Sequence, residues 1–354
     1  MGLLIAAGVL IFGYGAAYLA SSDVRYLTRA GFEEIRILQK RRPIEDMIAD
    51  PKTNPETRAY LHLVLQVRQH AADLGLEAGK TFTKYTDVGR DTLLLVLSGS
   101  PKNCICPITW KYPIVGRVSY KGFFDVGMAQ REAKRLADRG NDIFLRTAGA
   151  YSTLGWFEDP LLSTTMVRDS VELAGTVFHE LTHNTLFLKS ATSFNESFAQ
   201  MVGYRSAEEF FRSRGDTLLA NRARDRWHDE IVLGEFYRDL LGRLDAFYLT
   251  RPTGDSLEAG RREIGRWYQE QLEGPYGQRF RTFRVSRLAE RPINNAALVG
   301  VLAYRTHLDW FDRWYELNGN SVKASVAAMR ELMEGATDGD SAFARLEAKV
   351  TTNR

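Results

Sequence analysis

The sequence predicts an α+β fold that is mainly helical, with a small β-sheet ahead of a helical C-terminal body. Helical apolar spacing runs through residues 23–42 and 55–75, short β-type segments fill residues 92–157, and a nearly continuous helical pattern follows Asp169. The chain has 354 residues, of which 44% are hydrophobic and 26% are charged, as is typical of globular proteins. This length suits one large domain or two modest ones.

The charge balance and the cysteine content exclude two classes of protein. The 47 basic and 44 acidic residues nearly cancel, so the chain lacks the basic surplus of nucleic-acid-binding proteins. Cys104 and Cys106 are too few for a disulfide scaffold or a structural zinc site. A disulfide ring across one intervening residue would be strained, so we expect ordinary thiols on a strand, with a regulatory pair as the alternative.

The first element is an uncharged segment at residues 1–22, and residues 3–20 are mostly apolar. As a helix, residues 3–20 would span about 27 Å, close to the thickness of the hydrocarbon core of a bilayer. We expect a retained transmembrane anchor or a signal segment cleaved near Ala17, with a buried helix as the alternative. The protein would then belong to the cell envelope, anchored or exported on the periplasmic side. Arg25 and Arg29 follow the span, and the positive-inside rule would then place the body of the chain on the inner side of the membrane. The orientation therefore stays open.

The remaining elements follow in order. Pro43 ends the first amphipathic helix and Pro55 begins the second, which predicts a helical hairpin over residues 23–85. A predicted core over residues 86–205 holds a helix at 128–139 and short strands, which are expected at 92–97, 108–110, 117–120, 142–145 and 150–157. A helical pattern broken near Pro252, Gly274 and Asn318 predicts a helical C-terminal region, residues 206–354. We expect this region to complete a substrate cleft beside the core.

The central motif is His179-Glu180-Leu181-Thr182-His183, within a helix that Asp169 and Glu172 are expected to begin as a capping box. Positions i and i+4 share one helix face, so both imidazoles can bind one metal ion. Glu180 lies beside that face and can reach a metal-bound water rather than the metal itself. This pattern is typical of a zinc hydrolase.

Glu196 is the candidate third metal ligand. Residues 189–193 are polar enough for a turn, and a second helix is expected to run from about Ser193 to Gly203. An antiparallel helix pair with a short turn would bring Glu196 back beside His183. The alternative is a solvated helix carboxylate.

The combination of H-E-x-x-H with Asn195-Glu196-x-x-Ala199 resembles the gluzincin metallopeptidases, and residues 116–317 resemble a bacterial family of predicted aminopeptidases. The likeness rests on the segments 119–125, 151–160, 179–183, 194–196 and 294–296. The resemblance implies a zincin-like core, a zinc site of His179, His183 and Glu196, and Glu180 as catalytic base. Two features depart from gluzincins. The spacer before Glu196 is short, and Gln200 replaces an acid that often orients a zinc-bound histidine.

Several hydrogen-bond donors in the C-terminal part of the chain are further candidate site residues. Tyr304 is the candidate donor to the oxyanion of the reaction, with His307 and His228 as alternatives. Asn294 and Asn295 could bind a peptide backbone, although capping of the next helix explains them equally well.

Residues 149–160 occupy the position at which gluzincins carry an edge strand that pairs with the extended substrate. Tyr151 would contact the substrate there, but the acid that holds the substrate amine in large zinc aminopeptidases is absent from its usual place. Glu158 or Asp159 could substitute by charge pairing with an ammonium group. A turn or helix-capping role of Asp159-Pro160 is the alternative.

We therefore expect a zinc metallopeptidase, and specifically an aminopeptidase that acts on peptides, associates with the membrane through its N-terminal segment and binds no nucleic acid. The alternatives are a membrane-anchored endopeptidase or quality-control protease, and a non-catalytic envelope scaffold with a structural zinc site.

Three other sequence patterns are weaker evidence for a function. Residues 75–81 are one residue short of a phosphate-binding loop, and Asp225-x-x-His228 has the wrong acid for a di-iron site. The arginines at 212–226 form a solvated face or contact lipid headgroups.

Overall fold

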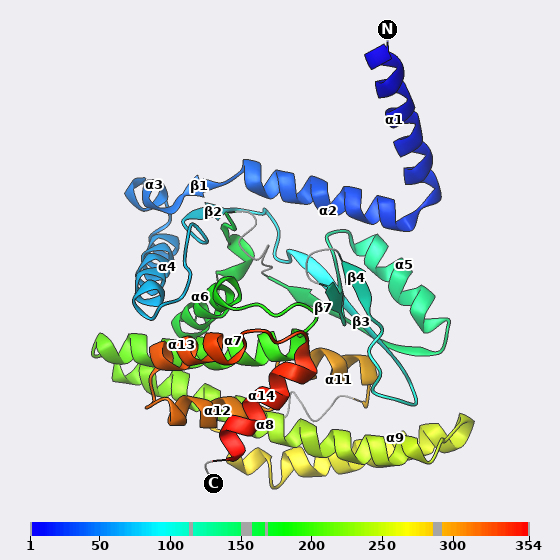
Figure 1. Cartoon of the computed structure of the whole chain (residues 1–354), viewed down its shortest axis with the longest axis vertical. Helices are drawn as coiled ribbons and strands as arrows, with labels where there is room; N and C mark the ends of the chain where they lie inside the picture. Colours follow the sequence, from blue (N-terminus) through cyan, green and yellow to red (C-terminus); the bar gives the residue numbers. More distant parts are fainter. Residues whose placement is uncertain (1, 113–115, 150–157, 167–168, 286–291, 353–354) are drawn as a thin grey trace.

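The computed structural model describes residues 2–112, 116–149, 158–166, 169–285 and 292–352. It confirms the α+β fold, in which helices predominate and a small sheet lies beside a helical body (Figure 1). The described residues form three short sheets, and one cavity, which is described below, lies between the central sheet and a group of packed helices.

Two helices begin the chain. Helix α1 spans Gly2–Ala20 and projects away from the body, and α2 spans Ser22–Gln39 and runs along it (Figure 1). The Ser21 hydroxyl accepts a hydrogen bond from Val24 N and caps α2. In the part of the chain that the structure describes, no helix combines the length and the apolar character needed to cross a membrane. The anchor or signal segment expected at residues 1–22 stays a prediction.

The helical hairpin expected over residues 23–85 is more broken than predicted. After α2 come β1 (Arg42–Pro43), the short helix α3 (Ile44–Ala49) and α4 (Pro55–Asp73). The Asn54 side chain caps α4 by accepting a hydrogen bond from Glu56 N, and Pro55 occupies the first helical position. The first helix thus ends at Gln39, before the expected Arg42, and Pro43 instead precedes the additional helix α3.

The central sheet consists of the antiparallel strands β6 (Lys121–Phe123), β3 (Leu94–Pro101) and β7 (Asn141–Ala148), in that order. Val96 pairs with Gly122 on one side and with Arg146 on the other, so these three residues form one cross-strand row. Helix α5 (Val126–Ala137) covers one face of the sheet, where Leu97 and Leu136 are buried. The other face points towards the cavity.

Two smaller sheets flank the central one. Strands β1, β2 (Lys84–Thr86) and β8 (Leu161–Leu162) form the first, and β4 (Trp110–Tyr112) pairs with β5 (Gly116–Val118) in the second. Strand β8 is followed by a short 3-10 turn, Ser163–Thr165, that leads towards the motif helix. The extended segment expected at residues 150–157 lies outside the described residues.

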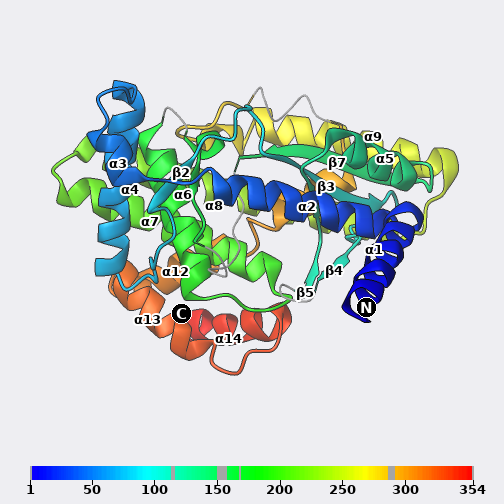
Figure 2. The ribbon, with the colours of Figure 1, turned by 90° about the horizontal axis from the view of Figure 1, so that it is seen from above.

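The helical body contains the motif helix, which packs against α4, α7 and α8 (Figures 1 and 2). Its helices are α6 (Ser170–Thr185), α7 (Thr192–Ser213), α8 (Thr217–Leu249), α9 (Gly254–Glu273), α11 (Asn295–Leu302), α12 (Leu308–Leu317), α13 (Val322–Leu332) and α14 (Gly339–Thr351), with a 3-10 turn at Gly277–Arg279. One apolar core joins α4, α6, α7 and α12–α14, and Phe194 contacts Phe311 and Phe343 within it.

Helix α7 is longer than predicted, because it continues past Gly203 to Ser213. Phe210 and Phe211 are buried in its added turns and extend its apolar contact with the body. The domain boundary predicted at residue 205 falls inside this helix. The division of the chain into domains stays a prediction.

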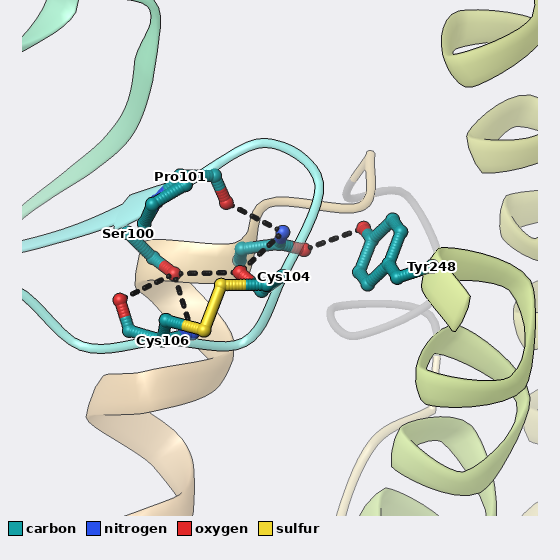
Figure 3. Close-up of a disulfide and its surroundings, with 6 residues drawn as sticks. Ser100, Pro101, Cys104, Cys106 and Tyr248 are labelled. Atoms are coloured by element: carbon teal, nitrogen blue, oxygen red, sulfur yellow. Dashed lines mark hydrogen bonds between the residues drawn. A yellow bond between two sulfur atoms is a disulfide. The ribbon is translucent and has the colours of Figure 1, made fainter. Parts of the chain in front are cut away.

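The expectation of two free thiols was wrong, because Cys104 and Cys106 form a disulfide (Figure 3). The loop after β3 turns around the Ser100 hydroxyl, which donates to the carbonyl oxygens of both cysteines and accepts from Cys106 N. This turn holds the two Cα atoms 5.3 Å apart, within the range that a disulfide spans.

Candidate metal centre

The motif helix α6 places both histidines on one face. The Asp169 side chain accepts hydrogen bonds from Val171 N and Glu172 N and so caps the helix, as expected. The reciprocal bond from the Glu172 side chain, which a capping box requires, is not seen among the described contacts. One turn separates His179 from His183, and their Nε2 atoms lie 3.1 Å apart. The predicted spacing therefore produces the expected convergence of the two imidazoles.

Helix α7 returns Glu196 to the two histidines. Glu196 Oε2 lies 3.1 Å from His179 Nε2 and 3.7 Å from His183 Nε2. The turn between the helices is fixed by Asn195, whose side-chain oxygen accepts from Leu188 N and whose amide donates to Leu188 O. The short spacer is therefore sufficient, because Asn195 closes the turn immediately before Glu196.

Two glycines allow the helices to approach closely. A Cβ atom added at Gly203 on α7 would lie 2.9 Å from the carbonyl oxygen of Gly175 on α6 and 3.5 Å from His179 Cβ. Side chains larger than hydrogen would therefore push α7 away from α6. This contact lies one turn from His179 and two turns from Glu196, so it helps to set the separation of the ligand atoms.

The three residues have the chemistry and the geometry of a zinc site. Their ligand atoms lie within 4.8 Å of one another. Three donors bound tetrahedrally at about 2.0–2.1 Å from one zinc ion would be roughly 3.3–3.4 Å apart, close to the separations of 3.1, 3.1 and 3.7 Å seen here. Two imidazoles and one carboxylate also form the ligand set typical of catalytic zinc.

The electrostatic coupling of the site is strong. Burial opposes the charge of Glu196, but the two imidazoles outweigh that effect and hold its pKa well below its usual range. Burial also opposes a charged His183, yet the Glu196 carboxylate raises the pKa of this imidazole. Burial raises the pKa of Glu180. The Nδ1 atom of His183 is buried with no hydrogen-bond partner among the described residues, and the ring contacts Phe187 edge-on.

The site opens into a cavity of about 870 Å³. Its walls are the inner face of the central sheet, helices α6 and α7, and the segment from α11 to Arg305. Glu180 lines this cavity together with the three candidate ligands, and Gln200 also faces it. Such a volume is typical of pockets that bind small molecules or short peptides.

Tyr304 is the predicted oxyanion donor that the structure brings to the centre. Its ring stacks beside the His179 ring with centroids 6.2 Å apart, and its hydroxyl accepts a hydrogen bond from Arg146 Nη2 at 3.4 Å. The negative charge of Glu196, followed by burial, raises the pKa of Tyr304 well above its usual range. The hydroxyl therefore stays protonated and can donate a hydrogen bond.

The other candidates do not reach the cavity. His307 stacks on Trp310 at 3.7 Å, and His228 Nε2 lies 3.2 Å from the carbonyl oxygen of Arg279. Glu158 pairs with Lys80 at 2.7 Å and Lys84 at 2.6 Å, and these hydrogen bonds lower its pKa to about 2. A carboxylate that is paired in this way, outside the cavity wall, is a poor partner for a substrate amine. Asp159 is buried and does not line the cavity, although its charge contributes to the raised pKa of Glu180. Tyr151 lies outside the described residues.

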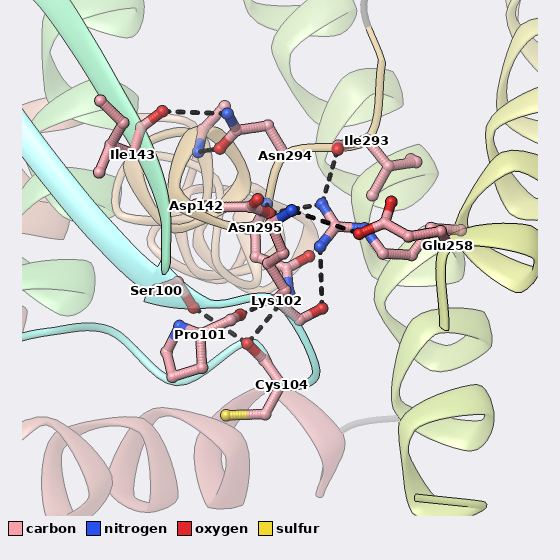
Figure 4. Close-up of polar contacts among 12 residues, drawn as sticks. Ser100, Pro101, Lys102, Cys104, Asp142, Ile143, Glu258, Ile293, Asn294 and Asn295 are labelled. Carbon is pink, nitrogen blue, oxygen red and sulfur yellow. Dashed lines mark hydrogen bonds and ion pairs between the residues drawn. The ribbon is translucent and has the colours of Figure 1, made fainter. Parts of the chain in front are cut away.

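The two asparagines have structural contacts (Figure 4). Asn294 caps α11 by accepting from Ala297 N and donates to Ile143 O. Asn295 is fully buried; its amide donates to the carbonyl oxygens of Pro101 and Cys104, and its oxygen accepts from the Tyr248 hydroxyl (Figures 3 and 4). Neither lines the cavity, so the helix-capping alternative describes Asn294, and Asn295 ties α11 to the sheet and to α8.

Two cavity residues were not identified as site residues from the sequence. Tyr120 follows β5 and Arg146 lies on β7, and both line the cavity. Burial raises the pKa of Tyr120 well above its usual range, followed by the charge of Glu196. Tyr120 stands within the segment 119–125 on which the family resemblance rests, which was the available signal. No sequence signal marked Arg146, because the strand expected at 142–145 ends one residue before it, whereas β7 continues to Ala148.

Comparisons with known proteins give one match. A family model described as "Putative aminopeptidase" matches residues 25–342, which is most of the chain. A search of curated proteins found no match, and a search of solved structures also found none.

Proposed function

The chain belongs to the family described as "Putative aminopeptidase", and from this membership we propose that it is a zinc-dependent peptidase of the gluzincin type with a zincin-like core. The observation that carries the proposal is the convergence of His179, His183 and Glu196 on one point in a cavity that Glu180 also lines. The proposed reaction is removal of amino-terminal residues from peptides.

In this proposal His179, His183 and Glu196 hold the metal ion. A zinc ion bound there would polarise the scissile carbonyl and lower the pKa of a coordinated water. Glu180 then accepts a proton from the attacking water and delivers it to the leaving amine. Its raised pKa supports this role, because a proton carrier works best when its pKa approaches the working pH.

Tyr304 is proposed to stabilise the oxyanion of the reaction. Its hydroxyl lies beside the candidate ligand His179, and its lone pair already accepts a hydrogen bond from Arg146. The O–H group is therefore free to donate into the cavity. A preformed donor of this kind lowers the barrier without needing to reorganise during the reaction.

Metal analysis tests the proposal directly. We expect about one zinc ion per purified chain, with loss of zinc in the variants Glu196→Gln and His183→Ala. Glu172→Gln is the matched control, because Glu172 lines the same cavity on the same helix but lies outside the ligand cluster. Absence of zinc from the wild-type protein after growth with zinc would refute the proposed centre.

A separate test must distinguish cleavage at the amino terminus of a peptide from cleavage at internal bonds. Peptides with free amino termini and the same peptides with acetylated amino termini should be compared as substrates. An aminopeptidase cleaves only the free peptides, whereas an endopeptidase cleaves both. Equal cleavage of both sets would leave the metallopeptidase proposal intact and remove the aminopeptidase assignment.

A further inference from the structure

The sheet wall of the cavity carries one charged residue in an apolar setting. Arg146 on β7 lies opposite Val96 on β3, and Leu94, Phe144 and Ala148 line the cavity on the same wall. Among the described residues of β3, β6 and β7 that line the cavity, Arg146 alone carries a charge. A half-buried guanidinium among apolar side chains is costly unless a partner compensates for it.

The contacts of Arg146 leave most of its donors unused. Within the described part of the chain, its side-chain hydrogen bond goes to the Tyr304 hydroxyl, and its guanidinium carbon lies 5.8 Å from the Tyr304 ring centroid. It forms no ion pair with a carboxylate among the described residues. Arg305, which lines the same cavity, provides the contrast, because its Nε atom lies 2.7 Å from Glu230 Oε2.

The position of Arg146 relates it to the candidate metal centre. The Tyr304 ring contacts both groups, because its centroid lies 5.8 Å from the Arg146 guanidinium carbon and 6.2 Å from the centroid of the His179 ring. One extended residue spans about 3.5 Å, so a group bound to Arg146 would lie within a few residues of a carbonyl at the metal centre.

The chemistry of the guanidinium identifies the partner. Arginine presents five N–H donors in a planar fork that matches a carboxylate in a two-point contact. The cavity carboxylates Glu172, Glu180 and Glu196 form no ion pair with Arg146 in the described part of the chain, and Glu196 instead contacts His179. A molecule bound in the cavity can supply the carboxylate that Arg146 lacks among the described residues.

We propose that Arg146 binds a carboxylate of the substrate, which makes short or acidic peptides the substrate class. The group is either the terminal carboxylate of a short peptide or an acidic side chain next to the scissile bond. This inference rests on the proposed peptidase function, since it names the substrate of the same cavity.

Binding by a catalytically impaired protein separates this inference from turnover. The zinc-loaded Glu180→Gln protein should be titrated in a calorimeter with the tripeptide Ala-Ala-Ala, with its C-terminal amide, and with the amide of Ala-Glu-Ala. We expect at least one carboxylate-bearing peptide to bind about tenfold more tightly than the neutral amide, as a charge-assisted hydrogen bond predicts. The preferred peptide then identifies the source of the carboxylate.

Variants of Arg146 complete the experiment. Arg146→Met, added to Glu180→Gln, should abolish the preference without weakening the neutral amide, and Arg146→Lys should retain part of it. Arg139→Met is the control, because it removes the same charge from an exposed turn and should leave the preference unchanged. Circular dichroism verifies that each variant folds.

Three outcomes would overturn the inference. Equal binding of all three peptides would show that no carboxylate is recognised, although zinc-dependent cleavage of neutral peptides would still support the proposed function. A preference that survives Arg146→Met would assign the carboxylate to another residue. Equal loss of kcat for acidic and neutral peptides in the single Arg146→Met variant, with no change in preference, would show that Arg146 acts through Tyr304 alone.

Discussion

At the scale of single residues, Glu180 separates metal binding from chemistry. It lines the cavity next to the ligand histidines but is not part of the ligand cluster. The variant Glu180→Gln keeps the size of the side chain and removes its ability to carry a proton. We expect kcat to fall by about 10²–10⁴-fold while zinc content stays at the wild-type level. A variant with normal zinc and normal kcat would assign the base to another residue.

The pair of His183 and Glu196 predicts how metal binding depends on pH. Glu196 raises the pKa of His183, and zinc binds only the neutral imidazole, so a proton must leave when zinc enters. Zinc affinity should therefore be constant above the raised pKa and fall about tenfold per pH unit below it. The pKa itself can be measured by NMR in the metal-free protein. It should decrease in Glu196→Gln, and an unchanged value would contradict the coupling.

The site residues differ in how far sequence could predict them. His179, Glu180 and His183 lie on one helix, so helical periodicity alone predicts their relation, and a short turn was enough to bring Glu196 back to them. Arg146 and Tyr120 reach the cavity through strand pairings whose register depends on distant segments. Glu158 was a reasonable partner for an amine by charge, but Lys80 and Lys84 take up that charge in the fold.

At the scale of secondary-structure elements, the contact of α6 with α7 controls the site. Gly203→Ala would place a methyl group 2.9 Å from Gly175 O, so the two helices must separate. We expect a loss of stability of about 1–3 kcal/mol in urea unfolding and weaker zinc affinity.

Gly242→Ala on α8 is the matched control for this prediction. A Cβ atom there has no neighbour within 4 Å, and alanine is the better helix former, so stability should increase by roughly 0.5–1 kcal/mol with zinc affinity unchanged. Equal behaviour of the two alanine variants would show that the glycine contact does not position the ligands.

The elements themselves were predictable to the extent that local signals define them. Asp169, Pro55 and the breaks near Pro252, Gly274 and Asn318 mark helix ends that the structure also has. Helix α7 was underestimated, because Gly203 looks like a terminus in the sequence but serves close packing in the fold. The disulfide was missed since the turn around Ser100, which brings the cysteines together, has no signature in the sequence.

At the scale of the whole molecule, the C-terminal helices pack against α7, the helix that carries the candidate ligand Glu196. Phe343 on α14 contacts Phe194 and Phe311, and Phe194 lies on α7 two residues before Glu196. Phe343→Ala should lower the free energy of unfolding by about 2 kcal/mol, because Phe343 is only partly buried. Lys349→Ala, on the exposed face of α14, should change it by less than about 0.5 kcal/mol. Similar urea midpoints for both variants would contradict this contribution of the packing.

Helix α1 has a practical consequence for handling the purified protein. It projects from the body with Ile11, Phe12 and Leu19 each more than 70% exposed, and the family match begins after it, at residue 25. An exposed apolar helix of this kind promotes self-association as the protein concentration rises. A chain that begins at Ser21 keeps the cap of α2 and every residue of the cavity wall. It is therefore the form on which calorimetry and crystallisation should first be attempted.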